Sequence, residues 1–464
     1  MTMQSRRDLF HAHRLMTQRA SLALLRGEPD IPDQPLRRLN VATFSGVLVG
    51  VIAMVGFLIW GLLGHNGSAL QKQAGILVLD QATGQSYVFC GNDLCPAVNY
   101  ASARLALASD SVTQQTVSQA SLDQFPRGPL IGIPGLPPLP GSGDLVRQPW
   151  SVCTQSGISP GAGQQTTTSL SVDLPTGGSP LRSSSELLVQ VQGQSPDWVI
   201  WDGQRLPIQH DALDALTAQS PTPVPSVWLN ALPEGPAFAA PAIPGRGQPV
   251  ADGPASSPAQ VGQTYQVPVA GGTQYYVLLK SGLATITQTQ DKLLQFLPGE
   301  PAQTTLTGSE VTAHTSNSTV PSDGLPASIP AAAAPDPTAA LCVVYTSAGG
   351  SSTLTAQVDT GGQLPPGGVA TGASTDVDQV ALPAGKGALV GDATGAGQDG
   401  GTISYFLVTA GRRYALSQTE VAGWLGYDPN LSQAVLLPAG VVDLIPSGPA
   451  LDPAQANKSL PSGG

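Results

Sequence analysis

The stretch Val41–Leu63, VATFSGVLVGVIAMVGFLIWGLL, has 23 residues and no charged side chain. At 1.5 Å of rise per residue, a helix of this length spans roughly 35 Å, which is enough to cross a hydrocarbon core of about 30 Å with some tilt. Trp60 lies near one end, where an amphipathic ring favours the membrane interface. The sequence therefore predicts a single transmembrane helix over residues 41–63.

The two sides of this stretch differ in charge. Residues 1–40 contain seven arginines and four acidic residues, a net charge of +3. Because the whole chain has a net charge of −11, the remaining residues carry −14. Arg37 and Arg38 directly precede the stretch, and the next basic residue after it is Lys72. The positive-inside rule then predicts a cytoplasmic N-terminus and an extracytoplasmic bulk. A signal peptide is the competing interpretation, but it would have a shorter apolar core nearer the start and a small-residue cleavage site.

The cytoplasmic head, residues 1–40, contains a second helical pattern. Within residues 9–26 apolar side chains recur at near-helical spacing, with arginine and glutamine between them, which predicts an amphipathic helix. Such a helix can lie on anionic membrane lipid or dock on a cytoplasmic partner, and periodicity favours neither. The residues expected to anchor the head are Arg14, Arg19, Arg26, Arg37 and Arg38.

Gly46 and Gly50 form a G-x-x-x-G pair within the membrane stretch. Small residues at this spacing let two helices approach closely, so the pair is a candidate for membrane-helix packing. Glycine is also common in membrane helices in general, and the sequence does not decide between the two interpretations.

The composition of the outer body favours a β-rich α+β fold. Only 11% of all residues are charged, whereas Gly (54) and Pro (43) together make up about a fifth of the chain, which indicates many turns and irregular connections. An acidic, lysine-poor body argues against nucleic acid as a partner, because phosphate contacts need clustered Lys and Arg.

All four cysteines, Cys90, Cys95, Cys153 and Cys342, follow the membrane stretch, and an even number there suggests disulfides. Four cysteines allow three pairings. Cys90 and Cys95 flank a short turn after a strand-like run, so we favour a bridge between them, which leaves Cys153 with Cys342. That second bridge would close a loop of about 190 residues, worth about 5 kcal/mol in a loop-entropy estimate. A zinc site is the rival, although the spacings are not C-x-x-C and no histidine lies near them in sequence.

Four short aromatic runs, each with a glycine or turn, predict β-hairpins in the outer body. Their spacing is irregular, which argues against a solenoid of fixed period. Pro/Gly-rich tracts separate them, and we expect the tail after Pro453 to be disordered. The runs lie within residues 76–89, 198–206, 274–296 and 404–416.

Motifs for catalysis are weak. Pro383–Ala388 (PAGKGA) is the nearest approach to a phosphate-binding loop, but it lacks the first glycine and the Ser/Thr of G-x-x-x-x-G-K-[ST]. Gly157–Gly161 (GISPG) matches the G-x-S-x-G nucleophile elbow, but it has no strand before it and no helix after it in the sequence pattern. No paired carboxylates are placed for acid–base work. We therefore predict no catalytic residue, no metal site and no cofactor, and leave enzymatic activity uncertain.

Several stretches resemble EccB, the single-pass core component of the type VII (ESX) secretion system of actinobacteria. The N-terminal run SRRDLFHAHRLMTQRASLALL before one membrane helix is similar to that family. Individually these motifs are weak, but their order runs through nearly the whole chain. The other matching motifs are GPLIGIPG (128–135), WSVC (150–153), LNALPEGPAF (229–238), LGY (425–427) and LIPSGPALDP (444–453).

The resemblance implies four small repeat modules, each of antiparallel strands plus a helix, around a central β domain held by a Cys153–Cys342 bridge. The Cys90/Cys95 pair is not part of the general family pattern. The expected organisation is a cytoplasmic head (1–40), the transmembrane helix (41–63), module 1 (64–125), the first part of the central domain (126–185), module 2 (186–225), a Pro-rich connection (226–258), module 3 (259–300), the second part of the central domain (301–394), module 4 (395–440) and a C-terminal tail (441–464).

The resemblance also implies a function and partners. The chain would be a structural subunit of the secretion membrane complex, present in more than one copy beside an EccC-type, FtsK-like ATPase, EccD and EccE. Some members of the family have been called ATPases, so an extracytoplasmic ATPase is one alternative. A cell-envelope (peptidoglycan) binding module is another, because the hairpins repeat and the outer body is acidic.

Overall fold

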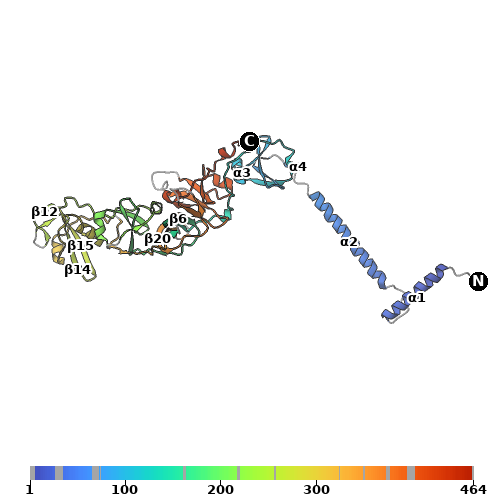
Figure 1. The fold of residues 1–464 in the computed structure, drawn as a ribbon, viewed down its shortest axis with the longest axis horizontal. Helices are drawn as coiled ribbons and strands as arrows, with labels where there is room; N and C mark the ends of the chain where they lie inside the picture. Colours follow the sequence, from blue (N-terminus) through green and yellow to red (C-terminus); the bar gives the residue numbers. More distant parts are fainter. Residues whose placement is uncertain are drawn as a thin grey trace, which may run out of the picture. The chain divides into compact units, whose positions relative to one another are not determined.

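The computed structural model describes residues 6–26, 35–64, 70, 73, 75–159, 163–216, 220–254, 258–322, 324–347, 351–371, 377–393 and 403–461. The chain divides into an N-terminal unit, Met1–Gln71, and a C-terminal unit, Lys72–Gly464. Each unit is described separately below, and the labels of helices and strands follow Figure 1.

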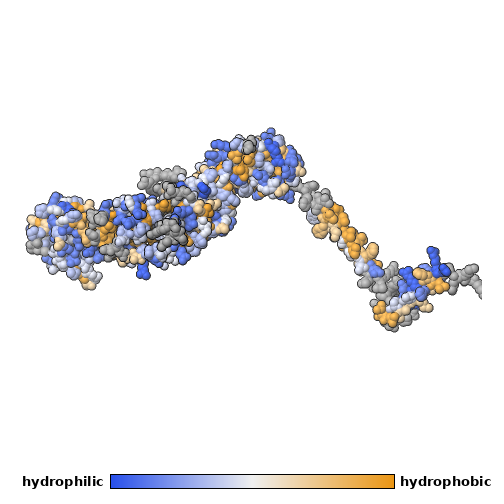
Figure 2. All heavy atoms as spheres, viewed as in Figure 1, coloured by the Kyte–Doolittle hydropathy of each residue, from blue (hydrophilic) through white to orange (hydrophobic). Residues whose placement is uncertain are grey.

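The N-terminal unit contains two helices, α1 (Arg6–Arg26) and α2 (Pro35–Gly64). Among the described residues, α2 is the one helix long and apolar enough to cross a membrane, with its candidate span at Asn40–Trp60. Figure 2 shows apolar residues along this helix. The sequence prediction of one apolar N-terminal helix is therefore confirmed, and the helix extends beyond the predicted span at both ends.

In the C-terminal unit, four sheets share one strand order. Three consecutive strands pair antiparallel, and a fourth returns to lie parallel beside the first of them. Sheet 1 consists of β1 (Ile76–Asp80), β2 (Ser86–Cys90), β3 (Asp93–Pro96) and β4 (Thr113–Val117). Sheet 2 consists of β8 (Ser185–Gln190), β9 (Asp197–Trp201), β10 (Gln204–Ile208) and β11 (Thr222–Pro223), with β18 (Ala331–Ala332) also paired to β8. Sheet 3 consists of β14 (Thr264–Val269), β15 (Gly272–Leu279), β16 (Gly282–Ile286) and β17 (Thr304–Thr305). Sheet 4 consists of β23 (Ala388–Asp392), β24 (Tyr405–Thr409), β25 (Arg412–Ala415) and β26 (Val435–Leu437).

Short helices follow the third and the fourth strand of each sheet. Tight turns bring the second and third strands together: Asp202 and Gly203 both have positive φ, which matches the right-handed twist of a two-residue hairpin turn. The helices between the third and fourth strands are α3 (Tyr100–Leu107), the 3₁₀ helix η2 (His210–Ala215), α6 (Gln288–Gln295) and α8 (Val421–Leu425). Those after the fourth strand are α4 (Gln119–Leu122), α5 (Ser226–Asn230), α7 (Gly308–Ala313) and α9 (Ala439–Val442).

A central sheet lies between the others along the C-terminal unit (Figure 1). Its strands come from two separate parts of the chain, one before sheet 2 and one after sheet 3, so sheets 2 and 3 are inserted between its halves. In spatial order the strands are β21 (Val369–Ala370), β22 (Gln379–Ala381), β6 (Gly163–Val172), β5 (Trp150–Ser159), β19 (Ala340–Thr346), β20 (Thr355–Gly362) and β7 (Ser179–Pro180). The remaining described elements are η1 (Ser142–Asp144), the pair β12 (Pro249–Val250) and β13 (Ala259–Gln260), and α10 (Pro453–Ala456).

Shared hydrophobic cores join the sheets. The largest core combines one face of the central sheet with sheets 2 and 4, and with α5 and α9. Trp150, Trp228 and Tyr345 are fully buried there, and each contributes about 1.5–3 kcal/mol of burial free energy. A second core joins sheet 4 to α3 of sheet 1, and a third places Leu293 of α6 against sheet 2. The chain therefore returns at its end to pack on α3 beside sheet 1.

Several predicted module boundaries are too early or too late. Strand β23 precedes the predicted start of module 4 at residue 395, yet it pairs along its length with β24. Strand β17 follows the predicted end of module 3 at residue 300, yet it pairs with β14. Strand β17 has only two residues, and a long connection separates β23 from β24. Local sequence patterns therefore did not reveal the partners of these strands.

The predicted disorder of the tail after Pro453 is wrong for the described residues. Helix α10 begins there with Asp452 as its N-cap and buries Ala456 fully. Asn457 donates a side-chain hydrogen bond to the carbonyl oxygen of Ala106 at 3.2 Å. The tail is therefore part of the packed interface with α3.

Candidate functional site

The sequence motifs with possible chemistry do not form a reactive site. Lys386, in the stretch that resembles a phosphate loop, donates to Asp144 Oδ1 at 2.9 Å. Gly157 and Ser159 lie on the long antiparallel strand β5, and the rest of the G-x-S-x-G match, Pro160 and Gly161, lies outside the described residues. In the part of the chain that the structure describes, no group of three or more His, Cys, Asp and Glu is placed to hold a metal.

The candidate membrane and cytoplasmic residues lie on the two N-terminal helices. Gly46 and Gly50 are on α2, where an added Cβ at either position would meet no described atom within 4 Å beyond the nearby backbone of the helix itself. Arg14 and Arg19 are exposed on α1. The predicted anchors Arg26, Arg37 and Arg38 lie in α1 and α2, but their side chains are outside the described part. The glycine pair thus has room for a neighbouring helix.

All four cysteines form disulfides in the structure, Cys90 with Cys95 and Cys153 with Cys342. This is the pairing favoured by the sequence. Cys153 and Cys342 lie directly opposite each other on β5 and β19, and both are fully buried. The bridge therefore joins the two halves of the central sheet, which are separated by 189 residues in sequence.

A short extended segment closes the open edge of the third strand in each of the four sheets. In sheets 1, 2 and 4 this segment follows the last short helix and has the pattern P-x-G-P: Pro126–Pro129, Pro233–Pro236 and Pro446–Pro449. In sheet 3 the corresponding residues are 314–316, without the prolines. We call these four stretches the closing segments.

Each closing segment makes the same two backbone hydrogen bonds to one residue of the third strand. In sheet 2, Arg205 N–H donates to the Pro233 carbonyl at 2.9 Å, and Gly235 N–H donates to the Arg205 carbonyl at 2.9 Å. In the other sheets the third-strand residue is different but the pattern is the same. The pairs are Leu94 with Pro126 and Gly128, Leu283 with His314 and Ser316, and Arg413 with Pro446 and Gly448.

Steric crowding explains why glycine stands at the third position of the P-x-G-P pattern. A Cβ on Gly448 would lie 2.3 Å from Tyr414 Cε1, and one on Gly128 would lie 2.4 Å from Cys95 Sγ. On Gly235 the nearest atom would be Gln204 Oε1 at 2.5 Å. The close approach of the segment to the strand therefore leaves no room for a side chain at Gly128 and Gly448, whereas at Gly235 the flexible end of Gln204 could move aside.

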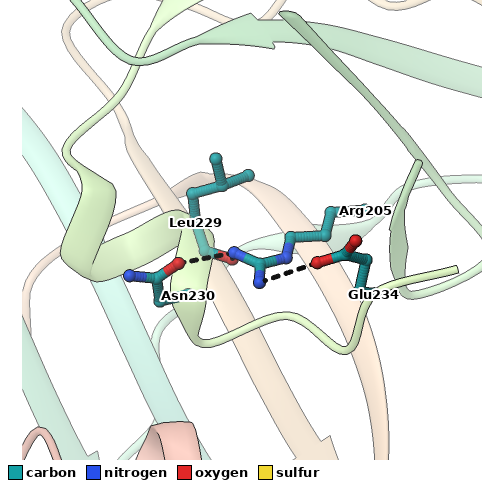
Figure 3. Close-up of polar contacts among 4 residues, drawn as sticks. All are labelled: Arg205, Leu229, Asn230 and Glu234. Atoms are coloured by element: carbon teal, nitrogen blue, oxygen red, sulfur yellow. Dashed lines mark hydrogen bonds and ion pairs between the residues drawn. The ribbon is translucent and has the colours of Figure 1, made fainter. Parts of the chain in front are cut away.

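The guanidinium group of Arg205 holds the closing segment of sheet 2 in place. Figure 3 shows it between Asn230 and Glu234, the end of α5 and the closing segment. It donates to Asn230 Oδ1 at 2.5 Å and to the Leu229 carbonyl at 3.3 Å, and pairs with Glu234 Oε2 at 3.3 Å. Its carbon Cζ also lies 4.9 Å from the Trp198 ring centroid, a cation–π distance. We call this arrangement the guanidinium clamp.

Sheet 4 repeats the guanidinium clamp at corresponding positions. Arg413 lies 5.3 Å from the Phe406 ring centroid and pairs with Asp443 Oδ1 at 2.5 Å, just after α9. Phe406 and Trp198 occupy the same position, three residues before the last residue of the second strand. The two clamps therefore arise from the same strand positions in sheets separated by about two hundred residues of sequence.

In sheet 1 the arginine of the clamp comes from the closing segment and not from the third strand. Here the third strand supplies Leu94, and Arg127 of the closing segment lies over Tyr87 at 5.1 Å and pairs with Asp123 at 3.0 Å. Compared with sheet 4, the aromatic residue and the acid keep their positions while the cation moves from strand to segment.

Sheet 3 closes without a guanidinium. Tyr276 holds the aromatic position, but Leu283 replaces the third-strand arginine and Val311 replaces the acid. These three side chains belong to one apolar cluster, in which Leu283 is 1% exposed. The same backbone closure is therefore supported by apolar packing in this sheet.

Sequence reasoning missed the closing segments. It noted the stretches around residues 128, 235 and 448 separately but did not compare them. One signal was P-x-G-P after three short helices. A second was an aromatic residue three positions before the last residue of each second strand. Sheet 3 lacks the prolines, so only the structure reveals its closure.

Three buried carboxyl groups carry raised pKa values, and burial is the cause for Asp359 on β20. Burial raises the pKa of Glu186 on β8 to about 7, and its Oε2 finds no hydrogen-bond partner among the described residues. Burial also raises the pKa of Asp291 on α6, against the opposing effect of hydrogen bonds from Gln295 and Gln303. Glu186 lies on β8 of sheet 2, Asp291 on α6 beside sheet 3 and Asp359 on β20 of the central sheet, so the three groups are spread over different parts of the fold.

Comparisons with known proteins agree with this architecture. A family described as type VII secretion system ESX-1, transport TM domain B, matches residues 3–461. A relative named ESX-3 secretion system ATPase EccB3 from Mycobacterium tuberculosis (strain CDC 1551 / Oshkosh) is 32% identical over 269 residues, 54% of this chain and 49% of that protein. A second, named ESX-5 secretion system ATPase EccB5 from the same organism, is 28% identical over 63% of this chain and 59% of that protein. The matched region is thus about half the length of the first of these relatives.

Two solved structures share the fold. One, titled as an EccB3 dimer from the ESX-3 core complex, aligns with a TM-score of 0.66 and 26% identity over 82% of this chain and 99% of the other. The other, titled as an intact ESX-5 inner membrane complex, aligns with a TM-score of 0.66 and 23% identity over 100% of this chain and 96% of the other.

Proposed function

The chain belongs to the EccB family of type VII secretion proteins, and we propose that it is a non-catalytic structural subunit of an ESX membrane complex. The observation that carries this proposal is the family match across residues 3–461, nearly the whole chain. The titles of the two similar structures, a core-complex dimer and an inner membrane complex, support it. The protein would contribute to export across the inner membrane by assembly and not by chemistry.

The proposed topology follows from the charge around α2. The Arg-rich head lies in the cytoplasm, α2 crosses the inner membrane once, and the C-terminal unit lies in the periplasm. The proposed partners are an EccC-type, FtsK-like ATPase, EccD, EccE, membrane lipid and further copies of this chain. The Gly46/Gly50 surface, where an added Cβ would meet no described atom within 4 Å outside the nearby helix backbone, is the proposed contact for a neighbouring membrane helix.

The proposed scaffold consists of four repeat modules around the central sheet. The common strand order, the helix after the fourth strand and the closing segment support the view that sheets 1 to 4 are copies of one module. Each module then extends from its first strand through its closing segment, which places the module ends near residues 131, 238, 316 and 451. A rigid set of modules held by the Cys153–Cys342 bridge would present fixed surfaces on the periplasmic side.

Affinity purification of the full-length chain from its own membranes in mild detergent tests the proposal. We expect the FtsK-like ATPase, EccD and EccE to co-purify, and native mass measurement to find more than one copy of this chain. Replacing Gly46 and Gly50 with leucine should reduce co-purification several-fold, whereas the matched variant Gly56→Leu, on the same helix and also without a neighbour, should not. Recovery of the protein only as a free monomer would contradict the assignment.

A second candidate is nucleotide hydrolysis, because the curated relatives are named ATPases. The nearest residue to a phosphate-loop lysine is Lys386, which pairs with Asp144. Under this alternative, the purified full-length chain turns over ATP and the Lys386→Ala variant loses that activity. Turnover at the level of a mock purification, unchanged by Lys386→Ala, would exclude it.

A further inference from the structure

The hairpin formed by β5 and β6 extends beyond the central sheet. The two strands pair with each other from Trp150–Val172 to Ser159–Gly163. Strand β19 accompanies β5 only as far as Thr154, and β22 accompanies β6 only at residues 169–171. The outer half of the hairpin therefore carries strand edges with no neighbouring strand among the described residues.

The backbone of this outer half points outward at alternate residues. Thr168 N–H donates to the Asp378 side chain and not across to β5, so Thr168 faces the outer edge of β6. Backbone direction alternates along a strand, so the N–H and carbonyl groups of Thr166 and Gln164 face the same edge. Asp378 thus satisfies the last outward N–H before the sheet ends, and Thr166 N–H and Gln164 N–H beyond it have no such partner in the described structure.

This edge lacks the features that normally prevent strand pairing. Residues 151–172 contain no Asp, Glu, Lys or Arg, although the chain as a whole is acidic. Edge strands are usually protected by charged side chains, proline or a covering segment. The third strands of sheets 1 to 4 are covered by closing segments, and the exposed tip of the β14–β15 hairpin carries Pro268, which has no N–H to donate. The edge of β6 has none of these among its described residues.

We propose that the outer edge of β6, residues 163–167, pairs antiparallel with the same edge of a second copy of this chain. The proposal rests on the assembly function above, in which several copies are present. An edge without charge can meet its own copy without like-charge repulsion, and an antiparallel pair is self-complementary about a two-fold axis. With the axis at Gln165, Thr166 of one copy exchanges backbone hydrogen bonds with the partner's Gln164.

This register gives a sharp crosslinking test. Directly opposed residues of a non-hydrogen-bonded antiparallel pair have Cα atoms about 4.5 Å apart, which lies within the range of a disulfide. In the full-length chain in its own membranes, Gln165→Cys should form a disulfide-linked dimer under mild oxidation. The matched control is Gly157→Cys, directly opposite Gln165 on β5 of the same hairpin and also exposed, which should crosslink at least ten-fold less.

A second pair of variants separates the two edges. Thr166→Pro removes the outward N–H of β6 and should abolish the Gln165→Cys crosslink, whereas Ser156→Pro makes the same change on the β5 edge and should leave it intact. Equal crosslinking at residues 157 and 165, no crosslinking at 165, or attachment of residue 165 to a different protein would each overturn the proposal. Co-purification of the secretion partners should persist in Thr166→Pro, so failure of this inference is distinguishable from failure of the proposed function.

Discussion

Sheets 2 and 3 close the same strand edge with opposite chemistry. In sheet 2, Arg205 bonds to Asn230, Leu229 and Glu234 beneath Trp198, whereas in sheet 3 Leu283 packs with Tyr276 and Val311. The two backbone hydrogen bonds of the closing segment are the same in both. Replacing a partly buried ion pair by apolar side chains of similar size is often close to neutral in free energy, which explains how one geometry can be kept with either set. The backbone pairing is therefore the common feature, and the side chains beneath it vary.

The largest effect is expected from placing a guanidinium in sheet 3. Leu283→Arg introduces a charge where Val311 offers no acceptor, and we expect sheet 3 to lose about 4 kcal/mol of local stability. Adding Val311→Asp, which recreates the acid of sheet 4, should recover part of that loss. Hydrogen exchange of the β14–β16 amides measures both effects; if the single variant is neutral, the apolar account of sheet 3 is wrong.

Removal of the cation from sheet 2 should cost less. Arg205→Ala takes away the bonds to Asn230 and Leu229, the exposed pair with Glu234 and the stacking on Trp198, so we expect a loss of about 2–3 kcal/mol at sheet 2. Arg182→Ala, an exposed arginine just before β8, is the matched control and should change stability by less than about 0.5 kcal/mol. If the two variants changed the free energy of denaturant unfolding equally, the guanidinium clamp would not stabilise sheet 2.

Sheet 2 should also respond to pH through Glu186. Its pKa is about 7 in the folded chain against a reference of 4.5, so the folded state binds the proton more tightly between these values. Stability contributed by the protonated carboxyl is full below about pH 4.5 and is lost as the pH rises to 7, by about 3 kcal/mol. Glu186→Gln should remove this dependence. A wild-type unfolding free energy that rises across the same window would contradict the sign.

The smallest expected difference is the response to salt. Raising the ionic strength from 0.1 M to 1 M should weaken the Arg205–Glu234 pair by about 0.5 kcal/mol, because the glutamate side chain is 56% exposed. Sheet 3 should not weaken, since Leu283 and Val311 carry no charge. Amide exchange rates of the two sheets at the two salt concentrations test this prediction. An equal loss of protection in both sheets would contradict an ionic contribution specific to sheet 2.

Sequence alone predicted the elements that depend on local patterns. The apolar run of α2, the amphipathic α1 and the aromatic hairpins were recognisable because each is defined by consecutive residues. The module ends were not, because β17 and β26 have two and three residues and each pairs with a strand far away in sequence. The clamp was missed for a similar reason: Arg205, Asn230 and Glu234 are spread over thirty residues and meet only in the fold.

Amide hydrogen exchange at the closing segments tests most directly the claim that four modules share one closure. The amides in question are those of Gly128, Gly235, Ser316 and Gly448, each of which donates to its third strand. The account predicts that all four exchange at least a hundred-fold more slowly than an unprotected peptide, whether a guanidinium or an apolar cluster lies beneath. If Ser316 exchanged at the rate of a free peptide while the other three were protected, the closure would belong to the guanidinium clamp and not to a common module.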